Sequence, residues 1–246
     1  RLGAEVMSQT IYAYISDGGV QEEISQGAGR VAGTLGLDNL IMFYDANNVQ
    51  LSTTVEEVDT EDVQKKYEAW GWKVLHINGN DVAQIRAALT EAKAEKQRPT
   101  LIIGDTLMGK GAMGPDQSSY ENKVSTHGQP LTAAGASIAE TIKNLGGDPE
   151  HPFAVFPEVE ALYAKRRAEL EAIMVERRAV KKAWAEAHPD LAAKMQKWFS
   201  GEAPAINWEA IQQKPNQATR GGSATCLGVL AENVENMIVA SADLSN

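Results

Sequence analysis

Two polar side chains that suit a hard metal ion follow apolar segments near the start of the chain. Asp17 comes directly after residues 11–16 and is followed by two glycines, and Asn47 lies just beyond residues 40–44. Mg²⁺ accepts carboxylate and amide oxygens and commonly shares its ligand shell with phosphate oxygens. Glycine has no side chain that would block the approach of a phosphate. The pattern therefore indicates part of a magnesium–diphosphate site.

The elements around these residues explain how they could meet. Residues 11–16 predict a buried strand that ends in an Asp-Gly-Gly turn, residues 21–35 a helix, and residues 40–44 a second buried strand. Strand, helix and strand in succession form a right-handed βαβ unit, which places the strands side by side or nearly so. Ligands bind at the carboxyl ends of such strands, where a helix N-terminus also favours phosphate.

The glycines of the helix predicted at 21–35 are unusual, because each costs about 1 kcal/mol relative to alanine. Gly27, Gly29 and Gly33 lie inside it, and Gly36 marks its end. Close packing of the helix backbone on the sheet is the expected compensation.

The alternation of strand and helix repeats further along the chain. Residues 73–77 and 100–104 predict strands, and residues 82–96 predict the helix between them. The fold class that follows is α/β, with a doubly wound parallel sheet. Residues 105–130 are irregular, and an irregular stretch of that length is often functional.

The second half of the chain predicts a helical excursion followed by the start of another domain. Helices are expected at residues 132–145, 159–188 and 190–199, then a linker at 201–216, a helix at 218–233 and a strand at 237–241. The predicted domains are residues 1–145, which bind the diphosphate, the helical excursion and linker 146–217, and the start of a second α/β domain at 218–246.

Composition excludes several classes of function. The 246 residues include 23 Lys and Arg against 33 Asp and Glu, a formal charge of −10, which disfavours nucleic acid and anionic membrane surfaces as partners. No apolar run approaches the roughly 20 residues that span a bilayer. The single cysteine, Cys226, allows no intrachain disulfide and fits a cytoplasmic location.

The spacing of Asp17-Gly18 and Asn47 resembles the thiamine-diphosphate motif, Gly-Asp-Gly followed some 25 to 30 residues later by Asn. Residues 17–25, 32–40 and 43–47 together resemble the transketolase family. The first glycine of the motif is Ser16 here, at a position that shapes the turn. Further similarity lies in 106–111, in Ser-Thr-His-Gly-Gln-Pro-Leu at 125–131, in Ala-Thr-Arg at 218–220, and in Ser-Ala-Asp-Leu from 241.

The resemblance implies a role for each of ten residues. Asp17 and Asn47 would be side-chain ligands of Mg²⁺ (or Ca²⁺), and Val49 would supply a main-chain carbonyl. Gly18 would contact the diphosphate, and Glu22 would belong to a network that links two active sites across a dimer. Met108 would lie near the thiazolium ring, and His127 would contact the diphosphate and the substrate. Arg220 and Ser245 would contact the substrate phosphate, and Asp243 would lie near the thiamine.

The implied activity is reversible transfer of a two-carbon ketol group between sugar phosphates, in the pentose phosphate pathway. The resemblance implies thiamine diphosphate and Mg²⁺ as cofactors and a homodimer in the full-length enzyme, with proton transfer through His127. It covers residues 11–246 and only part of a complete transketolase. We therefore expect a fragment that is inactive alone, since the family's glutamate that activates the aminopyrimidine would lie beyond Asn246.

Two alternatives remain open at this point. The first is another thiamine enzyme, namely a deoxyxylulose-phosphate synthase or the dehydrogenase component of a 2-oxo-acid complex. The second is a non-catalytic α/β module that binds Mg²⁺ or a nucleotide. Without the resemblance, a lone histidine such as His127 would more readily be a surface or capping residue.

Overall fold

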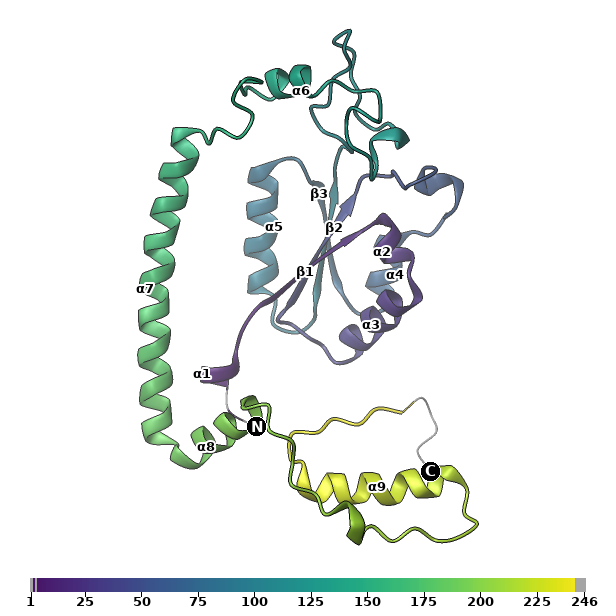
Figure 1. The fold of residues 1–246 in the computed structure, drawn as a ribbon, viewed down its shortest axis with the longest axis vertical. Coiled ribbons are helices and arrows are strands. Elements are labelled where there is room, and N and C mark those ends of the chain that lie inside the picture. The colour runs from purple at the N-terminus through teal and green to yellow at the C-terminus, as the bar shows by residue number, and fades with distance from the viewer. Residues whose placement is uncertain (1, 3, 242–246) are drawn as a thin grey trace. The chain divides into compact units, whose positions relative to one another are not determined.

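A four-stranded parallel sheet lies at the centre of residues 8–164 (Figure 1). The computed structural model describes residue 2 and residues 4–241. The strand order is β1-β2-β4-β3, and all three pairings are parallel. The strands are β1 (Ile11–Ser16), β2 (Leu40–Ala46), β3 (Lys73–Asn78) and β4 (Thr100–Asp105). The predicted α/β class with a parallel sheet is confirmed, and β1 and β2 are direct neighbours.

Helices cover both faces of this sheet. Figure 1 shows α5 on one face and α2, α3 and α4 on the other. The α-helices are α1 (Ala4–Met7), α2 (Asp17–Gln21), α3 (Glu23–Thr34), α4 (Val63–Ala69), α5 (Val82–Ala94), α6 (Ile138–Asn144), α7 (Pro157–Ala187), α8 (Pro189–Phe199) and α9 (Thr219–Asn233). Short 3₁₀ turns are η1 (Val55–Glu57), η2 (Val124–Thr126) and η3 (Trp208–Ala210).

Two apolar clusters hold the helices to the sheet. The cluster on the α3 and α4 side contains the fully buried Tyr67, Trp72 and Leu101, and the cluster on the α5 side contains Ile102 and Ala92. Leu101 and Ile102 are consecutive on β4, so their side chains point to opposite faces. β4 is the most buried of the four strands, with Thr100–Gly104 all buried.

Several expectations about the first βαβ unit are wrong. The single helix predicted at 21–35 is two helices, because Glu22 has an extended backbone (φ −69°, ψ 130°) that separates α2 from α3. The first helix starts at Asp17 itself, four residues earlier than predicted. β1 is not buried, since it is an edge strand with β2 as its only neighbour among the described strands, and Tyr12 and Tyr14 are exposed.

Two of the predicted helix glycines, Gly29 and Gly33, pack closely, but not on the sheet as predicted. A Cβ at Gly33 would lie 1.8 Å from the carbonyl oxygen of Trp70, and one at Gly29 would lie 3.1 Å from the Trp70 ring. Trp72 Nε1 also donates a hydrogen bond of 2.8 Å to the Gly29 carbonyl oxygen. At Gly27 an added Cβ would meet nothing within 4 Å. α3 is thus held against the turn between α4 and β3.

Later elements differ from prediction in three places. The helix predicted at 132–145 is only α6, because residues 132–136 form turns that include Gly135 at φ +91°. The strand predicted at 237–241 is not part of any sheet. The sequence reading missed α4, whose N-cap Asp62 accepts a hydrogen bond from the Lys65 amide.

The chain divides into two compact units. One comprises residues 8–164, and the other comprises residues 1–7 and 165–246. The domain boundaries predicted at 145 and 217 stay a prediction. No helix of the described residues is long and apolar enough to cross a membrane.

Candidate functional site

Asp17 and Asn47 lie in contact at the carboxyl edge of the sheet. The main-chain N–H of Asn47 donates to Asp17 Oδ2 at 3.3 Å, and the Tyr44 hydroxyl donates to Asp17 Oδ1 at 2.6 Å. The Asn47 side-chain Oδ1 accepts a hydrogen bond from the Val49 amide at 3.1 Å. These bonds arise because Asp17 directly follows β1 and Asn47 directly follows β2, in neighbouring parallel strands. The two residues are therefore neighbours, and their predicted role as side-chain ligands of one metal ion stays a prediction.

The two residues share one cavity of about 480 Å³. Its lining also includes the predicted site residues Gly18, Glu22, Val49 and His127. A Cβ added at Gly18 would meet nothing within 4 Å, so the backbone there is open to an approaching group. Six of the predicted site residues therefore surround one hollow.

The Asp17 carboxylate is buried without a compensating cation. Its residue is 3% exposed, and no ion pair within the described residues involves it. Burial raises the pKa of Asp17, against the lowering effect of hydrogen bonds from Tyr44, Asn47 and Asn48. A divalent cation beside Asp17 would stabilise the ionised carboxylate.

Unpartnered polar atoms around the cavity suit an anionic group. Gln21 Nε2 and His127 Nδ1 are buried and have no hydrogen-bond partner among the described residues, and both residues line the cavity. A side-chain amide nitrogen donates only, and a ring nitrogen donates when it carries the proton. Oxygens of a diphosphate would satisfy such donors, so the residues present fit this group.

Any metal here would depend on ligands other than clustered acids and histidines. In the part of the chain that the structure describes, no three His, Cys, Asp or Glu side chains could hold a metal together. One carboxylate with amide, carbonyl and phosphate oxygens is the donor set that Mg²⁺ takes when it shares a phosphate ligand.

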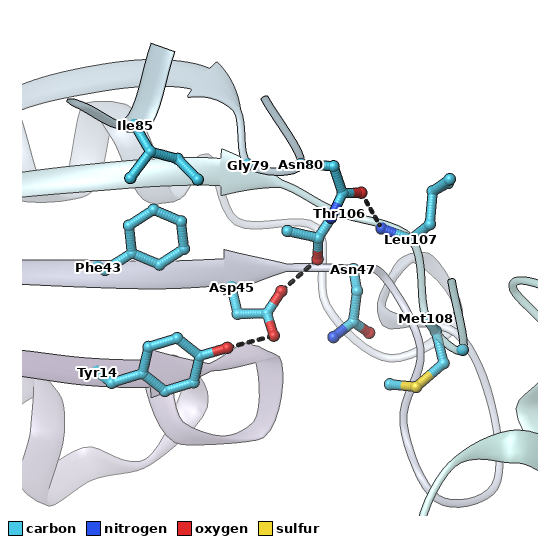
Figure 2. Close-up of a pocket in the computed structure, with 11 residues that line it drawn as sticks. Tyr14, Phe43, Asp45, Asn47, Gly79, Asn80, Ile85, Thr106, Leu107 and Met108 are labelled. Carbon is cyan, nitrogen blue, oxygen red and sulfur yellow. Dashed lines mark hydrogen bonds between the residues drawn. The ribbon is translucent and has the colours of Figure 1, made fainter. Parts of the chain in front are cut away.

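Met108 lies in a second cavity of about 490 Å³ (Figure 2). Asn47 lines both cavities, whereas Met108 does not line the one that contains Asp17 and His127. The second cavity lies between the ends of the strands and the segment after β4, and its lining includes Tyr14, Asp45 and Thr106.

Three further predicted site residues lie near the end of the chain. Arg220 is an exposed residue in the first turn of α9. Asp243 and Ser245 lie outside the described residues. The roles of all three stay predictions.

Sequence reasoning missed several residues around the cavity, and Gln21 is one of them. Tyr44 donates a hydrogen bond to the Asp17 carboxylate, and neither its residue type nor its place on a strand signals that contact. Residues 50–53 line the cavity from the loop that follows Val49. Their only sequence signal is proximity to Asn47.

The fold and the site define an α/β protein that binds a ligand at the carboxyl edge of a parallel sheet. Comparison with known proteins makes this specific. Residues 1–204 match the family model described as "Transketolase, thiamine diphosphate binding domain". The chain belongs to this family, and thiamine diphosphate is the cofactor that the family domain binds.

Individual relatives agree with the family match. The chain is 35% identical to transketolase-1 of the Arabidopsis thaliana chloroplast, over 99% of this chain and 32% of the relative. It is 33% identical to dihydroxyacetone synthase of Candida boidinii, over 99% of this chain and 34% of that protein.

Solved structures give the same result. A transketolase from Leishmania mexicana matches with a TM-score of 0.86 and 30% identity, over all of this chain and 36% of the other. A Pichia stipitis transketolase in complex with sedoheptulose-7-phosphate matches with a TM-score of 0.81 and 32% identity, over 96% and 35% of the two chains. The chain thus spans about a third of the length of its relatives.

Proposed function

We propose that the protein containing this chain is a transketolase that moves a two-carbon ketol group from a ketose phosphate to an aldose phosphate. The observation that carries the proposal is the contact between Asp17 and Asn47 at the edge of a cavity with unpartnered donors. Similarity to a transketolase complexed with a sugar phosphate supports the substrate class.

The proposed cofactor site uses this chain's residues for binding and orientation. Asp17, Asn47 and the Val49 carbonyl hold Mg²⁺, Gly18 leaves room for the diphosphate, and Gln21 and His127 donate to it. When bound, thiamine diphosphate supplies the carbon nucleophile and the electron sink of the reaction. His127 moves a proton at the substrate, and Glu22 takes part in a network that links paired sites.

Other features of the proposal come from the family resemblance. Met108 packs near the thiazolium ring, Asp243 lies near the thiamine, and Arg220 and Ser245 bind the substrate phosphate. The protein works as a cytoplasmic homodimer in the pentose phosphate pathway.

The experiment is a coupled assay with the whole protein in which this chain occurs. Xylulose 5-phosphate and ribose 5-phosphate should give product only when thiamine diphosphate and Mg²⁺ are both present. Replacing xylulose 5-phosphate, the ketol donor, by pyruvate should abolish turnover. Turnover with pyruvate, or none with the sugar phosphates, would overturn the proposal.

A second candidate activity rests on one relative, the dihydroxyacetone synthase, whose identity to this chain is 33% against 35% for the plant transketolase. The overall similarity is thus almost equal for the two activities. Replacing ribose 5-phosphate by formaldehyde as the acceptor decides between them, because transfer of the two-carbon unit to this one-carbon aldehyde gives free dihydroxyacetone. Faster turnover with formaldehyde than with ribose 5-phosphate would favour the synthase.

A further inference from the structure

A hydrogen-bonded carboxylate joins three strand ends on the face of the sheet opposite Asp17. Asp45, near the end of β2, accepts a hydrogen bond of 2.5 Å from the Tyr14 hydroxyl on β1 and a second one from the Thr106 hydroxyl just beyond β4 (Figure 2). Asp45 makes no ion pair within the described residues. Two hydroxyl donors therefore satisfy both of its oxygens.

The position of Asp45 makes this arrangement relevant to the metal site. Consecutive strand residues point to opposite faces, so Tyr44 reaches Asp17 on one face while Asp45 reaches Tyr14 and Thr106 on the other. Asn47 follows two residues later. The strand end that carries Asn47 is thus held from both faces.

The same carboxylate borders the segment that carries Met108. Thr106 donates its amide to the Ala46 carbonyl at 3.1 Å in addition to its hydroxyl bond with Asp45. The amides of the next two residues, Leu107 and Met108, are bonded to the side chains of Asn80 and Asn122. Asp45 therefore lies between the Asn47 loop and the start of the Met108 loop.

We propose that Asp45 is a positioning residue for the cofactor site, and that Tyr14 acts through it. By bonding Tyr14 and Thr106, the Asp45 carboxylate fixes the end of β2 and so sets the direction of the Asn47 side chain toward the metal. This role rests on the proposed function, because it requires that Asn47 bind a metal.

The test measures the dissociation constant of thiamine diphosphate by calorimetry at several Mg²⁺ concentrations, in the whole protein that contains this chain. Residues that orient metal ligands typically change metal affinity 10–100-fold when mutated, so we expect Asp45→Asn to raise the constant by about that factor. Tyr14→Phe removes one hydrogen bond and keeps the ring stacked on Phe43, and should raise it about 5-fold.

A matched control variant separates loss of metal-ligand positioning from a general loss of stability at the strand ends. Asp105→Asn alters a carboxylate at the end of β4 whose side chain bonds His76, and should leave the dissociation constant unchanged. The double variant with Tyr14→Phe and Asp45→Asn should bind no worse than Asp45→Asn alone, since Tyr14 acts through that carboxylate.

The outcomes distinguish this inference from the function on which it rests. Wild-type protein that does not bind thiamine diphosphate with Mg²⁺ overturns both. The positioning role alone is overturned if the wild-type protein binds thiamine diphosphate and Asp45→Asn binds it with the same affinity. A lower melting temperature of the metal-free Asp45→Asn protein would then show that Asp45 contributes only to stability. If Asp45→Asn does not fold, Tyr14→Phe decides by the same comparison.

Discussion

The contact between Asp17 and Asn47 follows from the position of each residue directly after a strand. Asp17 and Asn47 each follow a strand, so the parallel pairing of those strands brings them into contact. Tyr44 and Asp45 were not predictable as partners of this site. Their roles depend on which face of β2 each side chain occupies and on a residue 27 to 61 positions away in the chain.

The Asp17 carboxylate gives the most direct prediction about the metal. Asp17→Asn keeps the shape of the side chain and removes its charge, so Mg²⁺-dependent binding of thiamine diphosphate should weaken at least about 100-fold. The metal-free variant should be at least as stable as wild type, because it no longer buries an unpaired charge. Calorimetry with and without Mg²⁺ measures the first effect, and thermal unfolding measures the second. Unchanged affinity would remove Asp17 from the metal site.

At the level of helices and strands, length and apolar pattern predicted all four strands to within two residues. The split between α2 and α3 was not predictable. Glu22 interrupts the helix through its extended backbone conformation, and glutamate is a residue type that is common inside helices. α6 is shorter than predicted for a different reason, since the turns at 132–136 bond back to the preceding loop.

The α3 glycines provide a matched pair of substitutions. Gly33→Ala should destabilise the fold by about 1–3 kcal/mol or more, because the new methyl group would collide with the Trp70 carbonyl. Gly27→Ala should stabilise it by about 0.5–1 kcal/mol, since the site is open and alanine favours helix. Urea unfolding of both variants measures the difference. Equal effects would mean that α3 does not pack against the 70–72 turn.

The N-cap of α5 predicts a pH dependence. Hydrogen bonds from the Gln84 amide and side chain and from the Ala83 amide lower the pKa of Asp81. Because the folded-state pKa lies below the unfolded one, this stabilisation is present above the unfolded pKa of about 3.9 and is lost as pH falls through the folded value. Asp81→Ala should lower the melting temperature by about 2–4 °C at pH 7. The difference from wild type should shrink below about pH 4, and a difference independent of pH would contradict the assignment.

For the molecule as a whole, sequence pattern predicted the fold class and the family. The boundary between the two compact units falls within α7, a continuous helix with no break in its pattern at residue 164. The domain boundaries predicted at 145 and 217 followed changes in composition and stay a prediction.

The open side of β1 has a consequence for handling the isolated chain. Alternate backbone N–H and C=O groups of Ile11–Ser16 face away from β2 and have no other described strand beside them. Such an unpaired strand edge can pair with a strand from a second molecule, and the exposed side chains of Tyr12 and Ile11 make that association more favourable. Light scattering by concentrated solutions of the chain should therefore increase with time. A short peptide that pairs with the free edge of β1 should prevent that increase.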